Sequence, residues 1–322
     1  MPLPLWVVLR RNRPLVRRHL LAVADYQHLR TVLYRHLDMY EYVVLAFDQT
    51  IVKLIDTRDY AFRVMRCEDR MSELRQHIRE AFDTPALGHT YVINELVPTY
   101  AFLKEWYVQG YLEAYQTRVQ SFAWEAPHVI VFDLDSTLIT EERDVRLRDD
   151  DIPDSLLELK RMGCVLVLWS YGNREHVTHS LARTDLADYF DITLCEGSSG
   201  RSDAPLERRV VVDARADLIF VKKPFFSDDA TPRATDEGGD DVAKNLPKSP
   251  RVVLYYLRKF GVNFFKTITL VDDLASNDYS YDRFVHVKRC PEPRRDWSGY
   301  HDVLINNIEE HERRFDPGRR RQ

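Results

Sequence analysis

The segment formed by residues 128–140 constrains this chain more than any other part of its sequence. Val129–Phe132 is a short run of β-branched and aromatic residues, which is typical of a strand buried on both faces. The run ends at two aspartates, Asp133 and Asp135, with a single residue between them. Neighbouring carboxylates at the end of a buried strand repel each other and lose hydration, so structure alone rarely keeps them. A bound cation removes that penalty, and the segment therefore predicts a cation site.

Composition limits the class of protein. The 322 residues are enough for two domains, and a hydrophobic content of 44% is enough for a sizeable core. The four cysteines lie far apart without a Cys-x-x-Cys pair, which argues against zinc or a disulfide framework and favours a reducing compartment. The apolar residues 3–9 are too few to span a bilayer and lack the order of a signal peptide. We therefore expect a soluble intracellular protein without a membrane partner.

Both ends of the chain are rich in arginine, although the net charge is only −5. The simpler interpretation is a solvated surface, and the alternative is contact with nucleic acid or with an acidic partner. The arginines in these two clusters are Arg10, Arg11, Arg13, Arg17 and Arg18, and then Arg313, Arg314, Arg319, Arg320 and Arg321.

Residues 1–125 contain apolar residues at helical spacing, for example across 29–47 and 74–82. We therefore expect a mainly helical N-terminal module with a packing or docking role. Residues 46–50 imitate the segment at Asp133, but Gln49 stands where the second carboxylate belongs. We interpret Asp48 as an ordinary polar residue.

From residue 126 onward, apolar strands alternate with helical patterns. Strands are expected at Val129–Phe132, 165–169, 192–194, 267–271 and 284–287. This alternation predicts an α/β fold with a doubly wound parallel sheet in residues 126–322. An insertion at about 195–247 interrupts it, and its acidic stretch 227–241 has the composition of a mobile loop.

Polar residues follow three of these strands. Asp133, Ser170 and the pair Asp272-Asp273 each come at the end of an apolar run, and Lys248 precedes a helix that Pro250 begins. Ligands of open parallel sheets bind beyond the carboxyl ends of the strands. We therefore expect these side chains to share one site.

This ordered set resembles the haloacid dehalogenase-like superfamily, whose members are mostly phosphatases. The first motif of that family, Asp-x-Asp-x-Thr, matches 133–137, and its second, a strand-ending Ser or Thr, matches Ser170. Its third motif, a lysine before a helix, matches Lys248, and its acidic fourth motif matches Asp272-Asp273. The phrase at 168–173 is also similar to the subgroup that acts on phosphoserine in polymerase tails. The resemblance implies a Rossmann-like fold of the haloacid dehalogenase type.

The resemblance also implies roles for these residues. Asp133 would attack phosphorus to give an aspartyl-phosphate, and Asp135 would serve as general acid and then general base. Ser170 and Lys248 would contact the phosphoryl oxygens. The remaining implied roles are phosphate binding by Ser136 and Thr137, ligation of Mg²⁺ by Asp133, Asp273 and the carbonyl of Asp135, and support of that metal by Asp272 and Asn277.

The third motif has competitors. Lys222, Lys223 and Lys244 are also available, and Lys222 directly follows an expected strand. Lys248 is preferred because of the order of its neighbours.

At the level of the whole chain, the sequence resembles a baculovirus family of nucleocapsid-assembly proteins of about this size. That resemblance implies a location in the host nucleus and the virion, nucleocapsid proteins as partners, and a role in genome packaging. The implied substrate is a phosphoprotein, and the candidate is a small Arg-rich protein that condenses DNA. The alternative is a capsid-assembly scaffold that retains the fold without catalysis. The acid and the metal carboxylates are present, which favours the enzyme.

Overall fold

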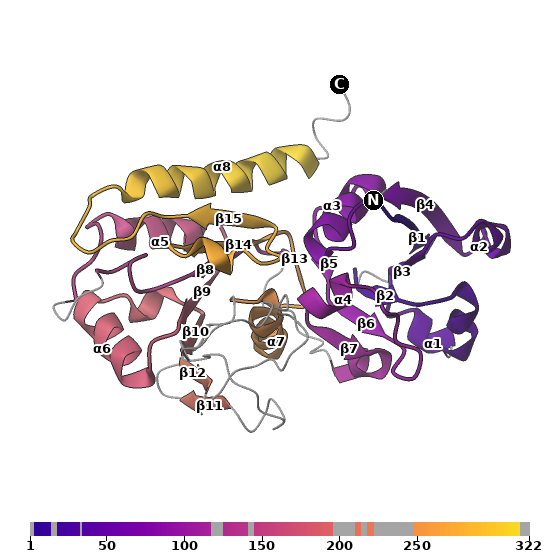
Figure 1. The fold of residues 1–322 in the computed structure, drawn as a ribbon, viewed down its shortest axis with the longest axis horizontal. Helices are drawn as coiled ribbons and strands as arrows, with labels where there is room; N and C mark the ends of the chain where they lie inside the picture. The colour runs from indigo at the N-terminus through magenta and orange to yellow at the C-terminus, as the bar shows by residue number, and fades with distance from the viewer. Residues whose placement is uncertain are drawn as a thin grey trace, which may run out of the picture. The chain divides into compact units, whose positions relative to one another are not determined.

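The computed structural model describes residues 3–13, 18–32, 34–116, 125–140, 145–195, 210–213, 218–221 and 248–315. The chain divides into two compact units, and each is assembled from segments that are distant in the sequence (Figure 1). Unit 1 comprises residues 1–127, 250–266 and 311–322, and unit 2 comprises residues 128–249 and 267–310.

Unit 1 contains a mixed sheet. Among the described residues it has six strands in the order β4-β1-β3-β2-β6-β7, of which β4, β1 and β3 are antiparallel and the others are parallel. The expectation of a mainly helical N-terminal module is therefore wrong. The strands are β1 (Leu5–Arg11), β2 (Leu20–Ala22), β3 (Tyr42–Ala46), β4 (Tyr60–Arg66), β6 (Thr90–Val92) and β7 (Val108–Gly110).

The error has a physical origin in β3. This strand lies between β1 and β2, and its first four residues are all buried. A strand buried on both faces is apolar at consecutive positions, so it satisfies a helical spacing as readily as a strand spacing. The helical pattern at 74–82 was interpreted correctly, because α3 buries only one stripe of residues. The helices of residues 1–125 are η1 (Tyr26–Thr31), α1 (Tyr34–Leu37), α2 (Gln49–Leu54), α3 (Met71–Phe82), α4 (Phe102–Glu105) and η2 (Tyr111–Gln116).

Later segments complete unit 1. Helix α7 (Pro250–Phe260) and strand β13 (Phe264–Phe265) belong to it, and β13 pairs with β5 (Leu87–Gly88). The polar residues highlighted in the sequence have local partners here. Asp48 caps α2 by accepting bonds from Thr50, and Arg10 and Arg11 form ion pairs with Glu41 and Asp38.

Unit 2 is built on a largely parallel sheet. The described strands have the order β11-β12-β10-β9-β8-β14-β15, and only β11 runs antiparallel to its neighbour. The parallel α/β organisation expected here is confirmed. The strands are β8 (Val129–Phe132), β9 (Val165–Ser170), β10 (Ile192–Cys195), β11 (Val210–Asp213), β12 (Leu218–Val221), β14 (Ile268–Asp272) and β15 (Arg283–His286).

One face of this sheet carries a helical layer. Alternate residues of β8 and β9, such as Phe132 and Leu168, share a buried core with α5 (Ile152–Arg161), α6 (Arg174–Thr184) and α8 (Trp297–Phe315). Figure 1 shows α5 and α8 over the strands β8, β14 and β15. Sequence reasoning did not anticipate α8. The short helices η3 (Ala187–Tyr189) and η5 (Ala275–Asn277) complete the unit.

Some expectations fall outside the described residues. These are the acidic stretch 227–241, most of the insertion 195–247, and the arginines Arg17, Arg319, Arg320 and Arg321. Within the described residues, none of the helices combines the length and the apolar composition needed to cross a bilayer.

The stability of unit 1 should depend on pH through His89. This histidine is fully buried, and its burial lowers the pKa to about 4 from an ordinary value of about 6.5. Because the folded protein resists protonation, the free energy of unfolding should decrease by about 3 kcal/mol as the pH falls from about 6.5 to 4. Urea unfolding of wild type and His89→Gln at several pH values measures this contribution.

As the pH decreases, the free energy of unfolding of the wild type should fall more steeply than that of the variant. Above pH 7 the two proteins should show the same dependence of this free energy on pH. Equal slopes below pH 6 would show that His89 does not contribute.

Candidate active site

Adjacent parallel strands bring the predicted residues to one edge of the sheet of unit 2. Asp133 directly follows β8, Ser170 ends β9 and Asp272 ends β14. Phe132 of β8 pairs in register with Leu168 on one side and Val271 on the other, so Asp133 and Asp272 lie at the same level and Ser170 lies one residue further along β9. The carboxyl edge expected from the sequence therefore gathers these side chains.

Asp133 lies at the centre of this edge. The Lys248 ammonium forms an ion pair with one of its carboxylate oxygens, and the Thr137 hydroxyl donates to the other at 2.9 Å. Lys248 Nζ also lies 2.8 Å from Asp272 Oδ2 and 5.1 Å from the centre of the Tyr171 ring. Thr137 was expected to bind phosphate, and in this structure its hydroxyl orients the Asp133 carboxylate.

Burial and charge act against each other in this group. Burial raises the pKa of Asp133, the ammonium of Lys248 opposes that rise, and the negative charge of Asp272 adds to it. For Lys248, burial favours the neutral amine, but Asp133 and Asp272 together raise its pKa above the ordinary value. We conclude that Lys248 is an ammonium and compensates much of the cost of burying the two carboxylates.

Asn277 links Lys248 to Asp272. Its Oδ1 accepts from the backbone N–H of Lys248 at 3.4 Å, and its Nδ2 donates to Asp272 Oδ2 at 2.9 Å. The backbone N–H of Leu274 donates to Asp272 Oδ1 at 2.8 Å. Both oxygens of Asp272 are therefore engaged by donors of the protein. The competing lysines Lys222, Lys223 and Lys244 lie outside the described residues.

Among the residues that the structure describes, Asp133, Asp272 and Asp273 form a group of acidic side chains compact enough to hold a metal ion. One ligand atom from each lies within 4.8 Å of the others. Oxygen donors of this kind suit Mg²⁺. Burial and the charge of Asp272 raise the pKa of Asp273, and Arg289 lies 3.6 Å from its carboxylate. Protein donors already engage both oxygens of Asp133 and both oxygens of Asp272.

Asp135 is held by two partners from the next strand and helix. The Ser170 hydroxyl donates to its Oδ2 at 3.0 Å, and His176 Nε2 lies 2.6 Å from its Oδ1. The Ser170 hydroxyl was expected to contact phosphate, whereas here it bonds Asp135 and accepts from the N–H of Gly172. Sequence reasoning missed His176, because a lone histidine three residues after the helix cap Asn173 matches no motif.

Ser136 lies in the turn between the two aspartates and Thr137. Its backbone adopts a left-handed conformation with φ of 62°, and the residue is buried. The N–H groups of Leu138 and Ile139 both bond the carbonyl of Leu134 and close this turn. Ser136 was expected to bind phosphate, and the structure places it in this turn directly after Asp135.

Arg148 forms hydrogen bonds to the backbone of the same turn. It was not identified from the sequence. Its guanidinium is fully buried and makes a bidentate pair with Asp296, with N···O distances of 2.7 and 3.0 Å. It also donates to the carbonyls of Ser136 at 3.2 Å and Lys288 at 2.8 Å. The two ends of the bidentate pair are 148 residues apart in sequence, so local patterns give no signal for it.

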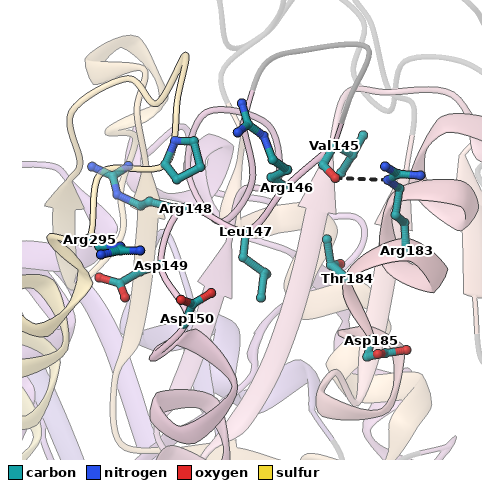
Figure 2. Close-up of a pocket in the computed structure, with 11 residues that line it drawn as sticks. Val145, Arg146, Leu147, Arg148, Asp149, Asp150, Arg183, Thr184, Asp185 and Arg295 are labelled. Carbon is teal, nitrogen blue, oxygen red and sulfur yellow. Dashed lines mark hydrogen bonds between the residues drawn. The ribbon is translucent and has the colours of Figure 1, made fainter.

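Arg148 also borders a pocket of about 710 Å³. Figure 2 shows its walls, which come from residues 145–150, from the end of α6, and from Pro293 and Arg295. A hydrogen bond of 3.2 Å from Arg183 Nε to the carbonyl of Val145 joins two of these walls. The pocket contains none of the residues predicted from the sequence, so the carboxylate cluster is a separate feature of unit 2.

Removing the Arg148 side chain should destabilise unit 2. Arg148→Ala removes the bidentate partner of Asp296, which keeps only the more distant Arg294, and removes a buried donor to the Ser136 carbonyl, so the free energy of unfolding should fall by about 3 kcal/mol. Urea unfolding measures this loss. Arg146→Ala is the matched control, since Arg146 is exposed on the same segment and its loss should change stability by less than about 0.5 kcal/mol. Equal losses in the two variants would contradict a structural role for the buried pair.

Comparison with known proteins places the whole chain in one family. Residues 4–316 match a family described as protein of unknown function (DUF705). The chain is 42% identical to the uncharacterized 38.0 kDa protein in the P143-LEF5 intergenic region of Autographa californica nuclear polyhedrosis virus, over 96% of this chain and 97% of that protein. It is 42% identical to an uncharacterized 36.0 kDa protein of Orgyia pseudotsugata multicapsid polyhedrosis virus, over 95% of this chain and 96% of that protein. It is 39% identical to an uncharacterized 41.0 kDa protein of Cryptophlebia leucotreta granulosis virus, over 96% of this chain and 86% of that protein. The chain therefore belongs to the DUF705 family, and the three relatives named here are proteins of baculoviruses.

Proposed function

We propose that this protein is a Mg²⁺-dependent phosphatase of the haloacid dehalogenase type that acts on phosphoserine or phosphothreonine in proteins. The observation that carries the proposal is the buried group of Asp133, Lys248 and Asp272, with Asp135 held in the same turn. On this proposal, unit 2 is a doubly wound Rossmann-like domain. Its phosphate site lies where β8, β9 and β14 end.

Asp133 is the nucleophile. One of its carboxylate oxygens forms a bond to phosphorus while the bond from phosphorus to the ester oxygen breaks, and that electron pair leaves with the alkoxide. Thr137 and Lys248 hold the carboxylate in one orientation before the attack. The Lys248 ammonium also offsets negative charge that develops on the phosphoryl oxygens. Water then attacks phosphorus, the bond to Asp133 breaks, and inorganic phosphate leaves.

Asp135 transfers the protons. In its acid form it protonates the departing alkoxide, and as a carboxylate it takes a proton from the attacking water. Its side chain is 36% exposed, compared with 10% for Asp133, so it is accessible to a leaving group from solvent. The two carboxylates therefore have different surroundings that suit their different tasks.

The acidic cluster fits the metal that this chemistry requires. Asp133 and Asp273 would hold Mg²⁺ together with the backbone carbonyl of Asp135, while Asp272 and Asn277 would orient the surrounding groups. When bound, the ion would screen the negative charge of the incoming phosphate.

The proposed substrate is a phosphoprotein. The segment between the nucleophile turn and α5 has only about a dozen residues, too few for the large helical cap that would enclose a small metabolite. The relatives are baculovirus proteins, which supports a viral substrate. We propose an Arg-rich protein that condenses DNA, since removing its phosphates would restore positive charge and strengthen its hold on DNA. This reaction would serve nucleocapsid assembly and genome packaging, with the enzyme in the host nucleus and virion.

Replacing the nucleophile should abolish turnover. Asp133→Asn keeps the shape of the side chain but removes the attacking charge, so hydrolysis of a phosphoserine peptide should decrease by at least about 10³-fold. A chelator should stop the wild-type reaction, and added Mg²⁺ should restore it. Phosphate release by the purified full-length protein measures all three results.

Asp48→Asn is the matched control for that substitution. Asp48 lies in the sequence that imitates the first motif, but its carboxylate only caps α2. This variant should retain wild-type activity. Absence of turnover by the wild-type protein with Mg²⁺ on any phosphoprotein would remove the enzymatic proposal.

Infected cells can separate the enzyme from the alternative of a non-catalytic scaffold. If catalysis is required, a virus carrying Asp133→Asn should accumulate phosphorylated sites on its substrate and fail to fill capsids. Phosphoproteomics and electron microscopy of wild-type and mutant infections measure both outcomes. Normal capsids without accumulated phosphosites would favour the scaffold.

A further inference from the structure

We propose that His176 is a positioning residue that makes this site act on phosphate esters of aliphatic alcohols, such as phosphoserine, which leave only when protonated. The inference rests on the proposed phosphatase function and deepens it. Its basis is the hydrogen bond of 2.6 Å between His176 Nε2 and Asp135 Oδ1.

His176 completes the restraint of the Asp135 carboxylate. Ser170, at the end of β9, forms a hydrogen bond with one carboxylate oxygen of Asp135. His176, in the first turn of α6, forms a hydrogen bond with the other. A carboxylate held at both oxygens cannot rotate about its last torsion without breaking one of these bonds. The position of the acid is therefore fixed before a substrate binds, and misplacement by about 1 Å can cost about 10²-fold in rate.

Two neighbouring residues, Asn173 and Gly172, set the position of the His176 imidazole. Asn173 caps α6 by accepting from the N–H of His176 at 2.9 Å, which fixes the first turn of the helix on which the imidazole stands. Gly172 leaves the required space. A Cβ at that position would lie 2.7 Å from His176 Cδ2, which is closer than real contacts, and 3.1 Å from Ser170 Oγ, which is a tight contact.

The leaving group determines how much this positioning matters. When the ester bond breaks, an aryl oxide departs as a stable anion, but an alkoxide must take a proton from Asp135. General acids of this kind contribute about 10²- to 10⁴-fold to rate. If the Asp135 carboxylate is no longer held in position, hydrolysis of alkyl phosphate esters should become slower while hydrolysis of aryl phosphate esters changes little. Damage to the fold or to phosphate binding would slow the hydrolysis of both.

The test compares kcat/KM of the full-length protein with Mg²⁺ on a phosphoserine peptide and on p-nitrophenyl phosphate. This quantity reports the steps up to leaving-group departure. His176→Ala should reduce kcat/KM for the peptide about 10- to 100-fold and for the aryl ester less than about threefold. His176→Gln, whose amide nitrogen can replace Nε2 as a donor, should recover most of the peptide activity.

Two further variants control for structure. Gly172→Ala should imitate His176→Ala, because the added methyl group displaces an intact imidazole. His179→Ala removes an exposed imidazole from the same helix and should change neither substrate. Equal loss on both substrates, no loss on either, or a His176→Gln variant as slow as His176→Ala would each overturn the inference. Absence of turnover by the wild type on both substrates would instead refute the proposed function.

Discussion

The structure of unit 2 depends on one buried ion pair. Lys248 and Asp133 are 115 residues apart in sequence, and each would be costly to bury alone. Together with Asp272 they leave one uncompensated negative charge beside the end of β8. A proton or a further cation can neutralise that charge, and burial together with Asp272 accordingly raises the pKa of Asp133. The candidate site is therefore a consequence of how the sheet compensates its own charges.

The neighbouring groups act mainly by restricting these charges. Thr137 fixes one oxygen of Asp133, Asn277 and the N–H of Leu274 fix Asp272, and Arg148 fixes the turn that carries Thr137. Two side chains that were expected to contact phosphate, Ser170 and Thr137, are committed to carboxylates here. Hydrogen bonds of this kind hold the carboxylates in fixed orientations, and on the proposed function this would reduce the reorganisation that the reaction requires.

The site was predictable from the sequence because its residues follow short strands that are buried on both faces. Such strands produce apolar runs that end abruptly, and the next polar residue marks the edge of the sheet. The same property misled the interpretation of unit 1, where β3 is also buried on both faces and satisfies a helical spacing. Arg148 and His176 depend on contacts 148 and 41 residues away in sequence, so no local pattern reveals them.

The spacing of the two aspartates follows from the core as well as from the chemistry. Leu134, which lies between them, is fully buried and belongs to the core shared with α5, α6 and α8. In extended backbone, residues two apart point to the same side, so a buried Leu134 directs Asp133 and Asp135 together away from that core. If the two aspartates were one or three positions apart in the sequence, one of the carboxylates would point into the apolar interior. In the similar sequence at Asp48, the residue two positions further on is Thr50, whose N–H and hydroxyl donate to the Asp48 carboxylate, and that segment caps a helix.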